Sequence, residues 1–247
     1  MIPAAKSPAF NRWFSRHAEQ RIRAHFSAVR LAGRHHLADA LATGPVLVVS
    51  NHCSWWDPLW LLALSNRIVQ ADAYAMMDAK NLERLPFFAK VGAFGVDRAR
   101  PDDGARSVRY AARLLDAPGK VLFVFPQGEE RASTLRPLGF LGGSAAIARV
   151  ARRAAVVPMA VRYEHGGEPR PVLYASLGAP LARHEDVEAG RAAQEAAVTA
   201  ELESIDTLLV RGDGAFETLW TTPPSVWERW AERALAWWTR GAIAVRD

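Results

Sequence analysis

Short apolar runs alternate with helix-like segments through the middle of the chain. The runs have the length of strands, and breaks such as the Gly-Pro pair before residue 46 mark where elements begin. The pattern predicts strands at 45–50, 73–77, 91–96, 121–125, 156–162 and 171–177, and helices at 58–64, 102–115, 143–152 and 185–210. Strands that alternate with helices indicate an α/β fold, with a mostly parallel central sheet covered by helices on both faces.

The first 36 residues are basic and amphipathic. They contain seven Lys and Arg against one Glu, whereas the whole chain has 31 Lys and Arg against 26 Asp and Glu. Apolar residues from Phe10 to Val29 recur at loosely helical spacing, which predicts a basic amphipathic helix or helix pair. This segment suits a membrane lipid surface, and packing on the domain is the alternative. Because the rest of the chain is near neutral, we expect no nucleic-acid partner.

A second amphipathic segment follows Pro223 and Pro224. Between Ser225 and Ile243, four tryptophans occupy one face of a predicted helix, and charged residues occupy the other face. Tryptophan suits the headgroup level of a membrane, although packing against the domain would also use such a face. We therefore expect three parts: an N-terminal basic amphipathic membrane-contact arm at 1–36, an α/β domain at 37–215, and a Trp-rich C-terminal helix at 216–247.

Composition limits the class of protein further. The chain has 247 residues, of which 50% are hydrophobic and 23% charged, as in ordered globular proteins. Cys53 is the single cysteine, so disulfides and cysteine-rich zinc sites are excluded, and we expect no metal site. The longest run without charged residues, 40–56, is too short to span a bilayer. Early arginines interrupt any secretory signal, so we expect a peripheral or monotopic protein at the cytoplasmic face of the cell membrane.

Polar residues gather where the predicted strands end, which is where open α/β sheets place their sites. The first strand leads into Asn51-His52-Cys53-Ser54-Trp55-Trp56-Asp57-Pro58, which contains a His-x-x-x-x-Asp pair. On its own this pair is a weak signal, since Asp57 before Pro58 also suits a helix N-cap. Three further blocks follow in order, Gly92-Ala93-Phe94-Gly95-Val96-Asp97-Arg98, Phe125-Pro126-Gln127-Gly128-Glu129-Glu130-Arg131 and Val156-Val157-Pro158-Met159.

In order and spacing, the four blocks resemble those of the glycerolipid acyltransferase superfamily, which includes the 1-acyl-sn-glycerol-3-phosphate and lysophospholipid acyltransferases. The resemblance covers about residues 45–182. It implies that His52 is the general base and that Asp57 orients and stabilises its imidazole, with no covalent acyl-enzyme. It also implies substrate-binding roles for Phe94, Asp97, Arg98, Pro126, Gln127, Gly128, Glu129 and Arg131.

The same resemblance implies the reaction and its partners. A fatty acyl group would pass from an acyl-CoA or acyl-carrier-protein thioester to a hydroxyl of a lysolipid, such as lysophosphatidic acid, and no cofactor is expected. Arg98 would receive an acceptor phosphate, and Gly128 would let the acceptor approach the backbone. Backbone N–H groups at the start of the helix after Asn51 would stabilise the oxyanion.

The third block departs from the family pattern Phe-Pro-Glu-Gly-Thr-Arg-Ser. Gln127, Glu129 and Glu130 stand where the family has Glu, Thr and Arg. A pocket for a phosphate monoester gains nothing from added carboxylates, so a neutral or glycosylated lipid acceptor is the alternative, unless both glutamates point to solvent. Two other hypotheses remain: a thioester hydrolase on the same scaffold, and a non-catalytic lipid-binding or nucleic-acid-binding protein.

Overall fold

The computed structural model describes residues 1–166, 169–212, 214–223, 230, 231 and 235. Within these residues, eight strands form one sheet in the order β4-β3-β5-β2-β6-β7-β1-β8. The strands are β1 (Ala28–Ala32), β2 (Val46–Ser50), β3 (Asp72–Asp78), β4 (Ala93–Val96), β5 (Lys120–Val124), β6 (Ala155–Glu164), β7 (Val172–Leu177) and β8 (Glu217–Thr221). Neighbouring strands are parallel except for the pairs β6–β7 and β1–β8. The predicted mostly parallel sheet is therefore confirmed.

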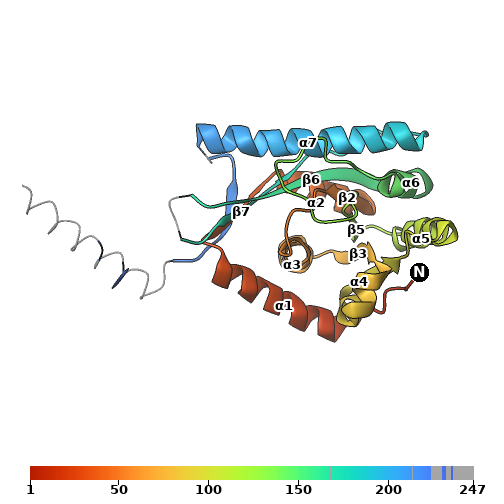
Figure 1. Ribbon diagram of the computed structural model, residues 1–247, viewed down its shortest axis with the longest axis horizontal. Helices are drawn as coiled ribbons and strands as arrows, with labels where there is room; N and C mark the ends of the chain where they lie inside the picture. The colour runs from red at the N-terminus through yellow and green to blue at the C-terminus, as the bar shows by residue number, and fades with distance from the viewer. Residues whose placement is uncertain (167–168, 213, 224–229, 232–234, 236–247) are drawn as a thin grey trace, which may run out of the picture.

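Helices cover both faces of the sheet (Figure 1). They are α1 (Pro8–His25), α2 (Arg34–Thr43), α3 (Asp57–Ala63), α4 (Ala79–Arg84), α5 (Pro101–Leu114), α6 (Gly143–Val150) and α7 (Val187–Arg211), with a π-helical turn at Leu64–Ile68 and a 3-10 helix at Pro86–Val91. Side chains of α1, α2 and α3 form one apolar core against the sheet, and side chains of α5, α6 and α7 form the other. This two-sided packing confirms the predicted α/β layers.

The central strands bring the candidate chemistry to one edge of the sheet. All five residues of β2 are buried, because its side chains enter both apolar cores in turn. Strand β2 pairs in parallel with β5 on one side and β6 on the other, with Val49 opposite Val124 and Pro158. The residues that follow β2 and β5 therefore emerge next to each other. Strands β3 and β4 end at the same edge, where Asp78 pairs with Val96.

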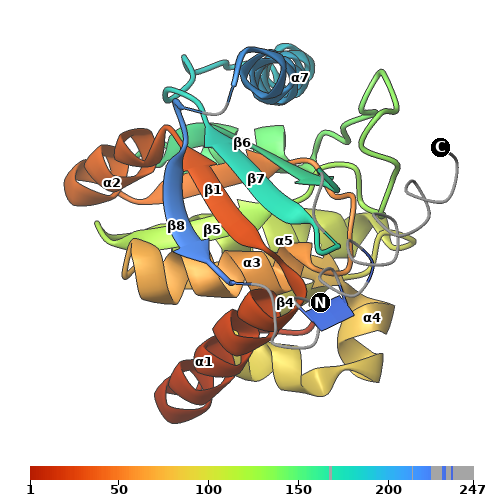
Figure 2. The same cartoon turned by 90° about the vertical axis from the view of Figure 1, so that its left-hand side faces the viewer.

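Two strands lie where the sequence pattern predicted other structure. Residues 28–32, predicted to continue the N-terminal helices, form β1, which lies between β7 and β8 in the sheet (Figure 2). Residues 217–221, which we had assigned to the C-terminal helical part, form β8. The first error arises because a short run such as Ala-Val-Arg-Leu-Ala fits the period of a helix as well as that of a strand. The predicted boundaries at residues 37 and 215 therefore do not follow the sheet.

Helix α1 forms within the N-terminal segment, as predicted. Ser7 caps its first turn, and Pro8 follows at the first helical position. The face bearing Ala18 and Ile22 is buried against the domain, while Trp13 stays 58% exposed. The predicted Trp-rich helix at 225–243 lies almost entirely outside the described residues. Among the helices of the described residues, none combines the length and apolarity needed to cross a membrane.

Candidate active site

His52 and Asp57 form a hydrogen-bonded pair just beyond β2. The Nδ1–H of His52 donates to Oδ2 of Asp57 at 2.7 Å, and Asp57 is fully buried. A carboxylate in this position fixes the tautomer of the imidazole, so that Nε2 keeps its lone pair. Nε2 is on the side of the ring that is free to meet a ligand, and the His52 side chain is 17% exposed. The pair can therefore take a proton from a bound hydroxyl.

Asp57 is held by donors from two parts of the chain. The backbone N–H groups of Cys53 and Ser54 donate to Oδ2 at 2.8 and 3.0 Å, and the hydroxyl of Tyr163 on β6 donates to Oδ1. Burial, followed by the charge of Asp57, raises the pKa of Tyr163 well above its ordinary value. The phenol therefore stays protonated and remains a donor. Sequence analysis missed Tyr163, because it lies 106 residues from Asp57 and in no polar motif.

One alternative for this turn is wrong. Asp57 does not act as an N-cap, because its carboxylate accepts N–H groups from the residues before it rather than from the first turn of α3. The N–H groups of Cys53 and Ser54, which lie before α3, already donate to Asp57. The use of N–H groups at the start of α3 to stabilise an oxyanion stays a prediction. The sequence of a short loop does not determine which acceptor its backbone N–H groups meet, because the same groups can turn toward a side chain or toward a ligand.

Three neighbours fix the position of His52 in the loop. The amide side chain of Asn51 bonds in both directions to the backbone of Val161, at 2.9 and 2.8 Å, and so anchors the loop to β6. The backbone N–H of His52 donates to Oε1 of Gln127 at 2.6 Å. The imidazole stacks on Phe125, with ring centroids 4.3 Å apart. These contacts leave the imidazole with little freedom to leave its position against Asp57.

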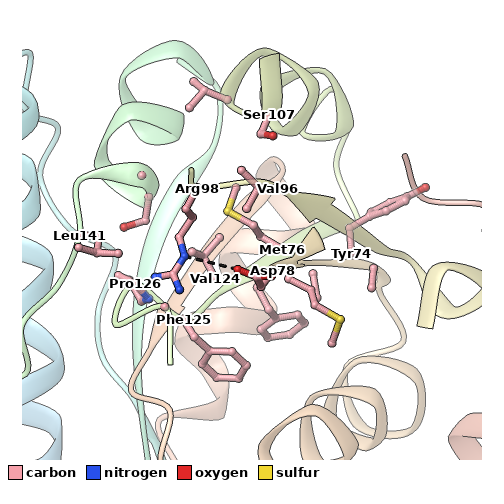
Figure 3. Close-up of a pocket in the computed structure, with 18 of the residues that line it drawn as sticks. Tyr74, Met76, Asp78, Val96, Arg98, Ser107, Val124, Phe125, Pro126 and Leu141 are labelled. Atoms are coloured by element: carbon pink, nitrogen blue, oxygen red, sulfur yellow. Dashed lines mark ion pairs between the residues drawn. The ribbon is translucent and has the colours of Figure 1, made fainter. Parts of the chain in front are cut away.

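A cavity of about 1110 Å³ opens beside His52. Its walls come from the ends of β3, β4 and β5 and from α3, α5 and α6, and most of them are apolar. Figure 3 shows Met76, Val96 and Val124 around its middle, with Tyr74 toward one side. A large apolar cavity with a few polar groups at one place is the common form of a small-molecule site. Here it can take a long apolar chain next to His52.

The eight predicted substrate-binding residues divide into two groups. Arg98, Pro126, Gly128 and Glu129 line the cavity. Four residues are absent from its wall: Phe94, Asp97, Gln127 and Arg131. Phe94 is buried in the apolar core against Tyr110, and Asp97 accepts the backbone N–H of Ala99 in the turn after β4. Gln127 is buried and holds His52, as described above, so its role is to support the loop.

Arg98 and Gly128 lie against each other at the cavity wall. Gly128 has a φ of +73°, and a side chain there would collide with the guanidinium of Arg98. This close approach, together with the positive φ, explains why glycine occupies the position. Nε of Arg98 is 3.6 Å from a carboxylate oxygen of Asp78 at the end of β3, as the dashed line in Figure 3 marks.

Cys53 has no nucleophilic role in this geometry. Its thiol donates to the backbone oxygen of Val161 at 3.6 Å. Burial, with a further contribution from the charge of Asp57, raises the pKa of the thiol far above its ordinary value. A protonated thiol is a poor nucleophile. Among the described residues, no three of His, Cys, Asp and Glu lie close enough together to hold a metal ion.

A model of the family named Acyltransferase matches residues 28–162, which is more than half of the chain. The chain belongs to the acyltransferase family. The match starts at β1 and ends in β6, so it contains the His52–Asp57 pair and the cavity-lining ends of β3, β4 and β5. Tyr163 is the first residue after the matched range. The resemblance noticed in the four sequence blocks is thereby confirmed, and so is the expectation of an enzyme.

The fold of this acyltransferase is similar to that of a solved structure. It is the crystal structure of the 1-acyl-sn-glycerophosphate (LPA) acyltransferase PlsC from Thermotoga maritima. The superposition covers 79% of this chain and 79% of the PlsC chain, with a TM-score of 0.59 and 16% sequence identity. At this identity, the similarity concerns the fold. None of the curated proteins matches the sequence.

Proposed function

We propose that this acyltransferase moves a fatty acyl group from an acyl thioester to a hydroxyl of a lysolipid. The observation that carries the proposal is the His52–Asp57 pair, whose histidine lines a large apolar cavity. A general base is required to activate a hydroxyl near neutral pH, and an apolar cavity suits an acyl chain. The family membership supports acyl transfer as the reaction class.

The proposed reaction is a direct transfer. Nε2 of His52 takes the proton of the acceptor hydroxyl while its oxygen attacks the thioester carbonyl carbon. The tetrahedral intermediate then collapses, the C–S bond breaks, and the imidazolium returns the proton to the leaving thiolate. Asp57 stabilises the imidazolium between these steps and keeps the ring aligned. The thioester carrier is either coenzyme A or acyl-carrier protein, which act as co-substrates.

A lipid acceptor requires access to a membrane surface, and α1 offers the best candidate. Its outward face exposes Trp13 together with Arg12, Arg16 and Arg21, while its opposite face packs on the domain. Exposed arginines attract anionic headgroups, and an indole suits the interfacial region. We therefore propose peripheral binding through α1, with the cytoplasmic face of the cell membrane as the location.

The proposal is tested by product analysis. The purified protein is incubated in detergent with a radiolabelled acyl thioester, with and without a panel of lysolipids. We expect the label in an acylated lipid and a release of thiol that depends on the lysolipid. Label in free fatty acid, with thiol release that no lysolipid increases, would instead identify a thioester hydrolase.

A further inference from the structure

A carboxylate faces the nitrogen that would take the acceptor's proton. Oε1 of Glu130 lies 3.9 Å from Nε2 of His52, and both residues line the cavity. The two atoms are too far apart to bond directly, but a hydroxyl oxygen at hydrogen-bond distance from Nε2 would lie within reach of Oε1 as well. An acceptor that approaches His52 therefore also meets Glu130.

The two arginines near this place are already paired with carboxylates of this chain. Arg98 lies beside Asp78, and Arg131 donates to Oε1 of Glu129 from both Nε and Nη2, at 3.1 and 2.8 Å. Arg131 lies over Gly139 and outside the cavity wall. Each guanidinium thus has a carboxylate partner, whereas Glu130 pairs with no Lys or Arg in the described part of the chain. The charge next to Nε2 is negative.

We infer that the acceptor carries hydroxyl groups, and no phosphate monoester, next to the hydroxyl that reacts. This inference rests on the proposed acyl transfer and specifies its acceptor. A second hydroxyl on the neighbouring carbon can donate a hydrogen bond to Glu130 while the first is aligned on His52. An uncharged polyol headgroup, as in a monoacylglycerol or a glycolipid, has this chemistry.

A phosphate monoester in the same place would meet Glu130, and the two nearby arginines already have carboxylate partners. Its two negative charges would lie within a few ångströms of the carboxylate, at a distance where like charges repel even in a well-solvated site. To bind, it would have to share the guanidinium of Arg98 with Asp78. An acceptor that carries hydroxyl groups there binds without any change to this pair.

Three other arginines of the cavity wall lie on other elements. Arg100 pairs with Asp97 in the turn after β4, while Arg109 and Arg149 come from α5 and α6. None of these belongs to the loops that carry His52 and Glu130.

The inference is tested by a competition between two acceptors that differ in the phosphate. Wild-type protein receives an equimolar mixture of 1-monoacylglycerol and lysophosphatidic acid with the same acyl chain, in neutral detergent, and the two products are counted. The same mixture is given to Glu130→Gln and Glu130→Arg. Glu203→Arg is the matched control, because this exposed glutamate lies on α7, away from the cavity wall. Thermal unfolding verifies that each variant is folded.

We expect wild type and Glu203→Arg to prefer monoacylglycerol. Glu130→Arg is expected to shift the product ratio toward the phosphate acceptor by about tenfold, and Glu130→Gln by less, because the first reverses the charge and the second removes it. Preference of wild type for lysophosphatidic acid, or an unchanged ratio in Glu130→Arg, would overturn the inference and leave the proposed transfer intact. If neither acceptor is acylated in a His52-dependent manner, the proposed function fails and the inference fails with it.

Discussion

Tyr163→Phe removes a single hydroxyl that holds Asp57. Of the four donors to this carboxylate, three bond to Oδ2, so the tyrosine is the one that satisfies Oδ1 among the described residues. A hydrogen bond to a charged group contributes about 1.5–3 kcal/mol, and its loss here leaves a buried oxygen without a donor. We expect the free energy of unfolding to fall by about 2 kcal/mol.

The same substitution should affect turnover rather than substrate binding. Tyr163 is absent from the cavity wall, so KM for both substrates should stay unchanged. If about two thirds of the lost energy appears as poorer alignment of His52, kcat falls about tenfold, which corresponds to about 1.4 kcal/mol. The ratio of the two kcat values should be constant from about pH 7 to about pH 9, because burial raises the pKa of Tyr163 well above its ordinary value of about 10.

Steady-state kinetics and thermal unfolding of Tyr163→Phe and Tyr110→Phe test this reasoning together. Tyr110 is a suitable control, since its hydroxyl accepts the backbone N–H of Ala4 at 3.0 Å and the residue is absent from the cavity wall. The control should lose about 1 kcal/mol of stability and keep its kcat. The reasoning is refuted if Tyr163→Phe loses stability but keeps wild-type kcat, because Tyr163 would then have a structural role alone.

Three further predictions follow from the site and from α1. The double variant Trp13→Ala, Arg16→Glu should bind anionic vesicles about tenfold more weakly in sedimentation, because it removes an exposed indole and reverses one charge. Arg211→Glu, on the opposite helical layer, is the control, and equal weakening in both variants would argue against α1 as the contact. Cys53 should resist iodoacetamide at about pH 8 in the folded protein, since burial raises the pKa of its thiol, and fast labelling without denaturant would contradict this. Gly128→Ala should lower kcat/KM by about tenfold while the protein stays folded, because an alanine at positive φ costs about 1–2 kcal/mol and would displace Arg98. Unchanged kinetics would show that the reaction does not need the close contact between Arg98 and Gly128.

The sheet was largely predictable, because its central strands are apolar runs between clear breaks. β2 and β5 are buried on both faces, so their sequences contain no alternation that would suggest another structure. β1 was missed for the opposite reason. Its arginine and its short length fit the helical period of the residues before it. A deletion of residues 1–36 would therefore remove a strand of the sheet, and point substitutions on α1 are the better test of membrane contact.

The polar pair of the site was predictable, but its supporting contacts were not. His52 and Asp57 lie on one short loop, so their spacing brings them together in this fold. Tyr163 reaches the pair from β6 and Gln127 from the turn after β5, and only the register of β6 and β5 with β2 places them there. The direction of the N–H groups of Cys53 and Ser54 depends on the same loop geometry. Sequence spacing carries no information about either.

The central claim is that His52 activates the acceptor hydroxyl, and thiol release from an acyl thioester measures it most directly. Wild type, His52→Ala and the exposed-histidine control His184→Ala are compared with a saturating lysolipid, after thermal unfolding has shown that all three are folded. A positioned general base contributes about 10²–10⁴ in rate, so His52→Ala should lose at least about a hundredfold in lysolipid-dependent release while His184→Ala keeps wild-type turnover. Lysolipid-dependent release at the wild-type rate in His52→Ala would contradict the account.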